Sequence, residues 1–506
     1  MLSTSLLLYL VLTACCSLSV SAVVHHEEGV QYGVWEISLL HEKMQVVFML
    51  SLLAFGVSVW YRRHYQAPVA GLPMTSTSPD KDHSGRLVRL LKTFGPGLMV
   101  CLADSDIGGL ATMAEAGSKT GYALMSLQFL LVPVLYVVQE MVVRLSVHRR
   151  KGVLALVRLE LGYHAACVLL VVMVILGVFA VMSEFSGIAA VGDLFGLSSL
   201  QSCSGASVLL ISVVLFGDYE VVERVGLILG SFLVVFLFTA VLCCPPWMEV
   251  MWSTFVPQRH GIHGASANDL RELTLANIGT VVTPWMLFYQ ASAIVEKQLS
   301  ASSLPMARLD TLLGSVITQI VMCAVLITFA KQAGGVDLQA MKMGEAFSVP
   351  LQPLLGKACT QALLAAGLLG SSLLATLVIS LGVAWNLAEY LDLELSGQKS
   401  PRIAAASKAT GTPMFRFFFI GTVVLSAAVI SSEMIGVMKL NILVQLLNGT
   451  LMPVVVGYVF VLVTRRGVLP DEHRVRGSYA AFVGIMVLLC SMLALGMGIQ
   501  TALTGG

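Results

Sequence analysis

Two carboxylates and a pair of glycines occupy the middle of a long apolar segment, 95–116. They are Asp104, Asp106, Gly108 and Gly109. A charged side chain at the bilayer centre costs at least about 2.5–3.5 kcal/mol on insertion scales, so it is usually retained for function. Adjacent glycines weaken a helix and let carbonyl oxygens face a cavity, and oxygen atoms are the ligands that hard divalent cations prefer. The segment predicts a helix broken at Gly108 and Gly109 with a cation site, although the carboxylates could also only cap a packed kink.

A second apolar segment, 273–296, is interrupted by a proline. Pro284 has no backbone N–H and its ring clashes with the preceding turn, so the carbonyl near Thr280 loses its helical partner. Thr283 precedes the proline and Trp285 follows it. Taken alone, this motif is also compatible with an ordinary proline kink in a membrane helix. Beside the first interruption, it predicts a second broken helix that contributes backbone oxygens.

The chain is very apolar for its length. It has 506 residues, of which 57% are hydrophobic and 12% charged, whereas a soluble domain carries about 25% charged residues. Most of the chain must therefore face lipid or other apolar helices. The formal net charge of +1 gives no reason to expect a nucleic-acid partner. The ten cysteines lack zinc-site spacing and no nucleotide or nucleophile motif stands out, so we expect no cofactor and no enzymatic activity.

Hydrophobic stretches of about 20 residues mark membrane-spanning segments. We predict a helix for each of them, because lipid cannot satisfy the polar groups of an open backbone. Eleven such spans make up the core of an all-α polytopic membrane protein. The predicted spans are 95–116, 121–143, 164–192, 203–217, 224–245, 273–296, 309–330, 357–386, 412–432, 439–463 and 477–498.

The two interrupted segments are each the first of five consecutive spans. Interruptions at corresponding positions of two five-span halves indicate an inverted-repeat transporter with its site near the middle of the membrane. The eleventh span, 477–498, falls outside this repeat. The loops after the second, sixth, eighth and tenth spans are the richer ones in Lys and Arg, which predicts that they lie in the cytoplasm.

Extra hydrophobic segments precede the core. Residues 1–22 are typical of a secretory signal or an uncleaved anchor. Residues 23–64 add a region with one further span, 65–94 form a cytoplasmic linker, and the transporter core covers 95–500. Such a leader predicts a multi-pass protein of the plasma membrane or an endolysosomal membrane in a eukaryotic-type secretory system.

Four short motifs follow one another along the core. They are Gly95-Pro96-Gly97 with Asp106-Ile107-Gly108-Gly109, Glu184-Phe185-Ser186-Gly187, Thr283-Pro284-Trp285, and Val444-Gln445-Leu446-Leu447-Asn448. In this order, and over about 90–500, the chain resembles the NRAMP family of divalent-metal transporters, and within it the NRAMP-related magnesium transporter branch. The resemblance implies a LeuT-like 5+5 inverted repeat with an eleventh core helix.

The resemblance also implies roles for individual residues. Asp106 would be the central ligand of the transported metal ion. The backbone carbonyls of Ala103 and Thr280 would add two more oxygens. Glu184, together with Asp104, would belong to a proton or charge pathway, or Glu184 would simply be hydrogen-bonded inside the bundle.

Three family positions differ in this chain. The family's Asn ligand is replaced by Gly109 and its Met ligand by Thr283, and oxygen-only sites suit magnesium, calcium and manganese. Gln445 and Asn448 match the magnesium branch, and Gln445 would close the metal site in the occluded state. The family's His is replaced by Trp285, a residue of the gate or pathway that carries no proton, so proton coupling is not expected. These departures predict transport of magnesium or manganese, or both, with iron as a further candidate, by alternating access.

Two other functions fit the same features. An amino acid or amine transporter of this fold could pair Asp106 with an ammonium group, and a transporter scaffold could serve as a non-transporting sensor. Outside the site, Glu140 and Arg144 stand four residues apart, which predicts an ion pair on a helix surface. The lipid bilayer is an expected partner, and the sequence does not indicate the oligomeric state.

Overall fold

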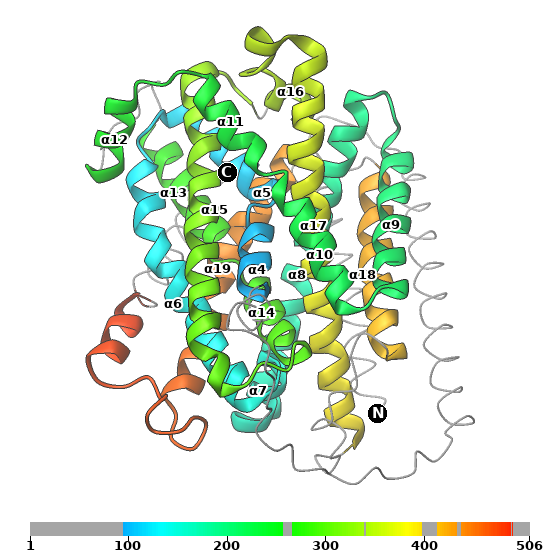
Figure 1. The fold of residues 1–506 in the computed structure, drawn as a ribbon, viewed down its shortest axis with the longest axis vertical. Helices are drawn as coiled ribbons and strands as arrows, with labels where there is room; N and C mark the ends of the chain where they lie inside the picture. The colour runs from blue at the N-terminus through cyan, green and yellow to red at the C-terminus, as the bar shows by residue number, and fades with distance from the viewer. Residues whose placement is uncertain are drawn as a thin grey trace, which may run out of the picture.

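The computed structural model describes residues 95–256, 266–338, 341–396, 412–432, 437–486 and 488. The predicted N-terminal segments 1–22, 23–64 and 65–94 lie outside these residues. Every regular element in the described part of the chain is a helix. Figure 1 shows long helices running side by side along one axis of the molecule, with short helices at both ends.

The first half of the core contains nine helices. They are α4 (Pro96–Asp104), α5 (Ile107–Thr120), α6 (Met125–Arg149), α7 (Val153–Glu160), α8 (Tyr163–Leu194), α9 (Ser199–Phe216), α10 (Tyr219–Ser231), α11 (Val234–Leu242) and α12 (Trp247–Phe255). The second half begins at residue 267. Its elements are α13 (Ala267–Val281), α14 (Pro284–Glu296), the 3-10 turn η1 (Ala301–Ser303), α15 (Leu304–Gln332), α16 (Met343–Ser348), α17 (Gln352–Ser396), α18 (Pro413–Ser431) and α19 (Val437–Thr464).

The helices match the predicted spans closely. Nine stretches of the described chain are long and apolar enough to cross a membrane, and the bent pair α4–α5 makes a tenth. The predicted eleventh span, 477–498, is described only in its first part, as the apolar helix Gly477–Met486. The short helices α7, α12 and α16 were not predicted, because they lie in the connections rather than in apolar windows of spanning length.

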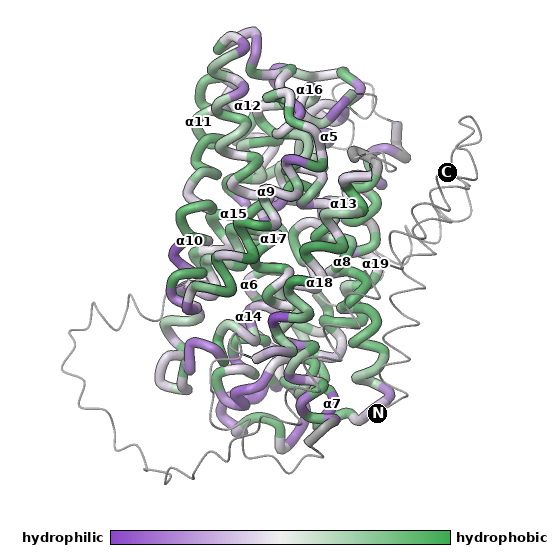
Figure 2. The backbone as a smooth tube through the Cα atoms, turned by 90° about the vertical axis from the view of Figure 1, so that its right-hand side faces the viewer, coloured by the Kyte–Doolittle hydropathy of each residue, from purple (hydrophilic) through white to green (hydrophobic). Residues whose placement is uncertain are grey.

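The connections alternate between the two ends of the bundle. In Figure 1, α7 and the end of α14 lie at the lower end, whereas α12 and α16 lie at the upper end. Figure 2 shows hydrophobic residues along the middle of the helices and hydrophilic stretches gathered toward the two ends. This pattern is expected of a bundle whose middle faces lipid and whose ends face water.

Helix α15 packs against the first broken span, which consists of α4 and α5. A β-carbon on Gly314 of α15 would lie 2.8 Å from the Cβ of Cys101 on α4, and one on Gly117 of α5 would lie 2.4 Å from the carbonyl oxygen of Leu326. Small residues at these positions let the helix backbones approach closely, which is how membrane helices gain packing energy. The broken span is therefore held against a straight helix along both of its halves.

Candidate functional site

The first interruption lies between α4 and α5. Helix α4 ends at Asp104, α5 begins at Ile107, and the two axes are bent by 48° at Ser105 and Asp106. The prediction that Gly108 and Gly109 form the break is wrong by one turn, because both glycines lie in the first turn of α5. They serve close packing instead, since a β-carbon on Gly108 would lie 2.2 Å from the Nε2 atom of Gln445.

The second interruption lies between α13 and α14. Helix α13 ends at Val281 and α14 begins at Pro284, so the break covers Val282 and Thr283. Thr283 has extended backbone angles, φ −82° and ψ 129°. Pro284 thus stands at the start of a helix, where its missing N–H costs nothing. The carbonyl of Thr280, four residues earlier, has no proline N–H to bind and is free to serve as an oxygen ligand.

The two interruptions contact each other through side chains. The Oγ1 atom of Thr283 donates a hydrogen bond of 3.2 Å to Oδ1 of Asp104. Both residues are fully buried. The other oxygen of this carboxylate, Oδ2, has no hydrogen-bond partner among the described residues. A buried polar atom without a partner is rare in folded proteins and indicates a place for a water molecule or an ion.

Asp106 sits at the centre of this arrangement. Its Oδ1 atom accepts a hydrogen bond of 2.6 Å from the backbone N–H of Gly109 and so caps α5. From α19, the Nε2 atom of Gln445 approaches the same oxygen at 3.5 Å. Asn448 donates to Oε1 of Gln445 at 3.1 Å and orients the amide. The capping role foreseen as an alternative is therefore real, and it coexists with the position at the break.

Glu184 of α8 closes another side of the first interruption. Its Oε2 atom accepts a hydrogen bond of 3.3 Å from the backbone N–H of Ile107. In a continuous helix that N–H would bind the carbonyl oxygen of Ala103. Because it binds Glu184 instead, the carbonyl of Ala103 loses its helical partner, as the carbonyl of Thr280 does. The Oε1 atom of Glu184 has no hydrogen-bond partner in the described chain, although the residue is fully buried.

Gly109 and Trp285, two of the predicted site residues, offer no side-chain oxygen to an ion. Gly109 has no side chain, and a β-carbon there would lie 3.2 Å from Oδ1 of Asp106. Trp285, in the first turn of α14, is 2% exposed. Its Nε1 atom is buried without a hydrogen-bond partner among the described residues. The indole therefore lies inside the bundle, next to the second interruption.

The chemistry of this arrangement is that of oxygen donors around one central carboxylate. Across the described parts of the chain, no three His, Cys, Asp or Glu side chains come together in a way that could hold a metal ion. An ion at Asp106 would therefore take most of its ligands from neutral donors, such as carbonyl, hydroxyl and amide oxygens. Hard divalent cations accept such ligands and often keep some of their water.

One anchor of the first broken span is not among the residues predicted from the sequence. Asp310 of α15 accepts hydrogen bonds from the N–H groups of Gly97, at 2.7 Å, and Leu98, at 3.2 Å. These are orphan donors of the first turn of α4, and a carboxylate there also favours the positive end of the helix dipole. Asp310 is the only carboxylate of the predicted span 309–330 and stands at its start, and this was the signal that could have revealed it.

Contact between α13 and α19 depends on a glycine. A β-carbon on Gly279 would lie 2.0 Å from the carbonyl oxygen of Gln445 and 2.9 Å from the backbone nitrogen of Gly449. We expect Gly279→Ala to push α19 away and to move Gln445 from Asp106. Overpacking of this kind costs about 1–3 kcal/mol, so metal uptake should fall about tenfold or more.

Gly457, also on α19, provides the control for that variant. A β-carbon there meets nothing within 4 Å, so Gly457→Ala should leave uptake and thermal stability unchanged. The measurement is uptake into proteoliposomes at matched protein content. Unchanged uptake in Gly279→Ala would show that the contact between the two helices does not position the amide.

Residues 97–500 match the protein family described as natural resistance-associated macrophage protein-like, or Nramp. The chain belongs to the Nramp family. Among its relatives, the divalent metal cation transporter MntH of Staphylococcus haemolyticus is 24% identical over 277 residues, which are 52% of this chain and 61% of the relative. The protein of the same name from Agrobacterium fabrum is 24% identical over 323 residues, 61% of this chain and 68% of the relative.

Solved structures share the fold. A manganese transporter of Eremococcus coleocola, in complex with an aromatic bis-isothiourea substituted compound, superposes with a TM-score of 0.62 at 18% identity, over 85% of this chain and 90% of that one. MhsT in complex with L-phenylalanine gives a TM-score of 0.52 at 12% identity, over 82% and 98% of the two chains. At these identities the likeness concerns the fold alone. The LeuT-like architecture predicted for this Nramp protein is confirmed, as is its multi-pass membrane character.

Proposed function

We propose that this Nramp protein transports divalent metal ions, with magnesium and manganese as its substrates. The observation that carries the proposal is the position of Asp106 at the helix break, with the amide of Gln445 3.5 Å from its Oδ1 atom. The carbonyls of Ala103 and Thr280, released by the two interruptions, and the hydroxyl of Thr283 supply further oxygens. The relatives named above are called divalent metal cation and manganese transporters, which supports the substrate class.

The choice of magnesium beside manganese follows from the donor set. By the resemblance of the motifs, Thr283 takes the place of the family's thioether ligand and Gly109 takes the place of its amide ligand. Oxygen donors suit magnesium and manganese, whereas sulfur favours softer transition metals. Asn448 fits the same proposal. Its Nδ2 atom donates a hydrogen bond of 3.1 Å to Oε1 of Gln445 and so holds that amide toward the site.

Burial of the site favours alternating access as the transport mechanism. Asp106, Thr283 and Gln445 are at most 2% exposed, so an ion can reach them only after helices move. The interrupted spans allow such movement, because each has two halves joined by non-helical residues. Glu184 and Asp104, each with one unpartnered carboxylate oxygen among the described residues, are the groups we propose for a charge pathway, and Trp285 would line the route.

The relatives named above are bacterial and give no support for an endolysosomal location.

Uptake into proteoliposomes tests the proposal. Purified full-length protein is reconstituted, and influx of manganese, magnesium, iron and calcium is compared with protein-free vesicles. We expect manganese and magnesium to enter and to compete with each other. Uptake of manganese and iron without magnesium would keep the transporter but overturn the argument from Thr283 and Gly109. Inhibition by amino acids, with no metal flux, would favour the amino acid or amine alternative, and no flux of either kind would favour the sensor.

A further inference from the structure

A methionine from another helix fills the space that Gly109 leaves open. A β-carbon on Gly109 would lie 2.5 Å from the Cε atom of Met322 on α15, 3.2 Å from Oδ1 of Asp106 and 3.5 Å from the carbonyl oxygen of Asp104. Met322 is fully buried. The end of its side chain therefore occupies the volume of a residue-109 side chain, directly beside the carboxylate of the candidate metal site.

Helix α15 is held in register so that Met322 must point at the break. One turn before it, the Oγ1 atom of Thr318 donates a hydrogen bond to the carbonyl oxygen of Cys101 on α4. One turn after it, the carbonyl oxygen of Leu326 lies against Gly117 of α5, 2.4 Å from where a β-carbon would be. Residues four apart share one face of a helix, so Met322 faces the junction between α4 and α5. Its placement is a consequence of contacts on both sides.

The sulfur of Met322 is not used for any other interaction that the structure describes. Three other thioethers near the interruptions accept hydrogen bonds: Met99 from the hydroxyl of Tyr289 at 3.1 Å, Met113 from the amide of Gln128 at 3.3 Å, and Met286 from the amide of Gln139 at 3.3 Å. Met322 makes no such bond in the described chain. A methionine has three rotatable side-chain bonds and a polarisable sulfur, so rotation of its last bonds can present the sulfur to an ion without movement of the backbone.

We propose that Met322 is a specificity-determining residue that supplies a thioether ligand to the metal ion at Asp106. The proposal rests on the proposed function, because it concerns the same site and the same ions. Met322 adds one soft donor from α15 beside the oxygen donors, and those oxygens remain the ligands that magnesium uses. Sulfur ligands select softer cations, so Met322 strengthens binding of cadmium most, of manganese less, and of magnesium not at all.

Metal titration of purified protein tests this assignment. Isothermal titration of the full-length wild type and Met322→Leu is carried out with cadmium, manganese and magnesium. Leucine keeps the volume of the side chain and removes the sulfur. We expect cadmium affinity to fall about tenfold, manganese affinity to fall less, and magnesium affinity to stay the same. Cadmium K-edge X-ray absorption should show a sulfur neighbour in the wild type and none in the variant.

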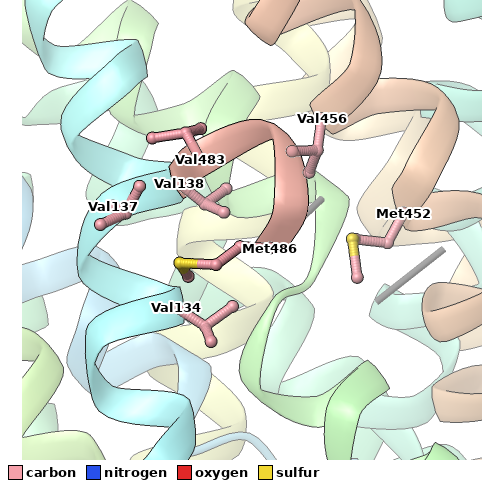
Figure 3. Close-up of a pocket in the computed structure, with 7 residues that line it drawn as sticks. All are labelled: Val134, Val137, Val138, Met452, Val456, Val483 and Met486. Carbon is pink, nitrogen blue, oxygen red and sulfur yellow. The ribbon is translucent and has the colours of Figure 1, made fainter. Parts of the chain in front are cut away.

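A matched methionine elsewhere provides the control. Met452 on α19 lines an apolar cavity with valines of α6 and the helix Gly477–Met486, and Figure 3 shows only valine and methionine side chains around it. Met452→Leu removes a buried sulfur from a place without ligand oxygens and should leave all three affinities unchanged. As a second route, Gly109→Ala places a methyl group 2.5 Å from Cε of Met322, pushes the thioether aside and should lower cadmium affinity while the sulfur stays in the chain.

The outcomes separate the inference from the function on which it rests. A cadmium-to-magnesium affinity ratio that Met322→Leu leaves unchanged would overturn the role of Met322, and so would an equal loss for all three ions, since that indicates packing alone. If Asp106→Ala still weakens metal binding in the same assay, the proposed function survives either result. A wild-type protein that binds none of the ions would remove both proposals together.

Discussion

Metal uptake should fall about 30-fold or more when Asp106 is replaced with alanine. The substitution removes the carboxylate that lies between the amide of Gln445 and the N–H of Gly109. Loss of one partner from a buried, hydrogen-bonded charge interaction costs about 2–5 kcal/mol, and each 1.4 kcal/mol corresponds to a tenfold change in an equilibrium constant. The measurement is the initial rate of manganese uptake into proteoliposomes.

A conservative variant separates ligand loss from helix capping. Asp106→Asn keeps a side-chain oxygen that can accept from the N–H of Gly109, so α5 stays capped while the charge is lost. We expect it to be nearly as inactive as the alanine variant but as stable as the wild type. Asp471→Ala is the matched control, because that carboxylate is 79% exposed and pairs with Arg474 at the surface. Wild-type uptake in Asp106→Asn would show that a metal charge partner is not needed there.

Replacing Glu140 with alanine should destabilise the protein strongly. Glu140 is 2% exposed, and its Oε1 atom lies 2.7 Å from Nη2 of Arg144 and 2.6 Å from Nη2 of Arg308. The hydroxyl of Tyr479 approaches Oε2 at 3.4 Å. Removal of one partner from a buried pair costs about 3–5 kcal/mol. Because the Arg308 side chain is 34% exposed and remains partly solvated, we expect about 3 kcal/mol.

The midpoint of thermal unfolding in detergent checks this prediction. The control is Glu220→Ala, since Glu220 and Arg224 are also four residues apart but their side chains are 80% and 75% exposed, at 3.6 Å. An exposed pair contributes at most about 0.5 kcal/mol, so the midpoint should hardly change. Equal midpoints for Glu140→Ala and the wild type would mean that water replaces the carboxylate between the two arginines.

That buried cluster also corrects an expectation from the sequence. The spacing of Glu140 and Arg144 predicted a pair on a helix surface, and the pair exists, but it is buried. Spacing along one helix says which side chains are neighbours. It does not say what covers them. Here Arg308 of α15 and Tyr479 of the helix Gly477–Met486 cover them, and both come from distant parts of the chain.

Much of the architecture follows from the sequence by itself. The spans can be located because lipid forces every spanning segment to be apolar and helical, and this constraint acts on each segment locally. Pro284 marks the second interruption for the same reason, since the missing N–H is a property of the residue. Asp106 stands out because an ionisable group in an apolar segment is costly wherever the helix packs.

Only the tertiary structure decides how these features combine. The first break lies at Ser105 and Asp106 rather than at Gly108 and Gly109, because the carboxylates of Asp106 and Glu184 bind the N–H groups that begin α5. The glycines admit neighbouring side chains, among them Met322. Contacts between residues more than 200 positions apart depend on how helices pack against each other, and no local pattern in the sequence encodes that packing.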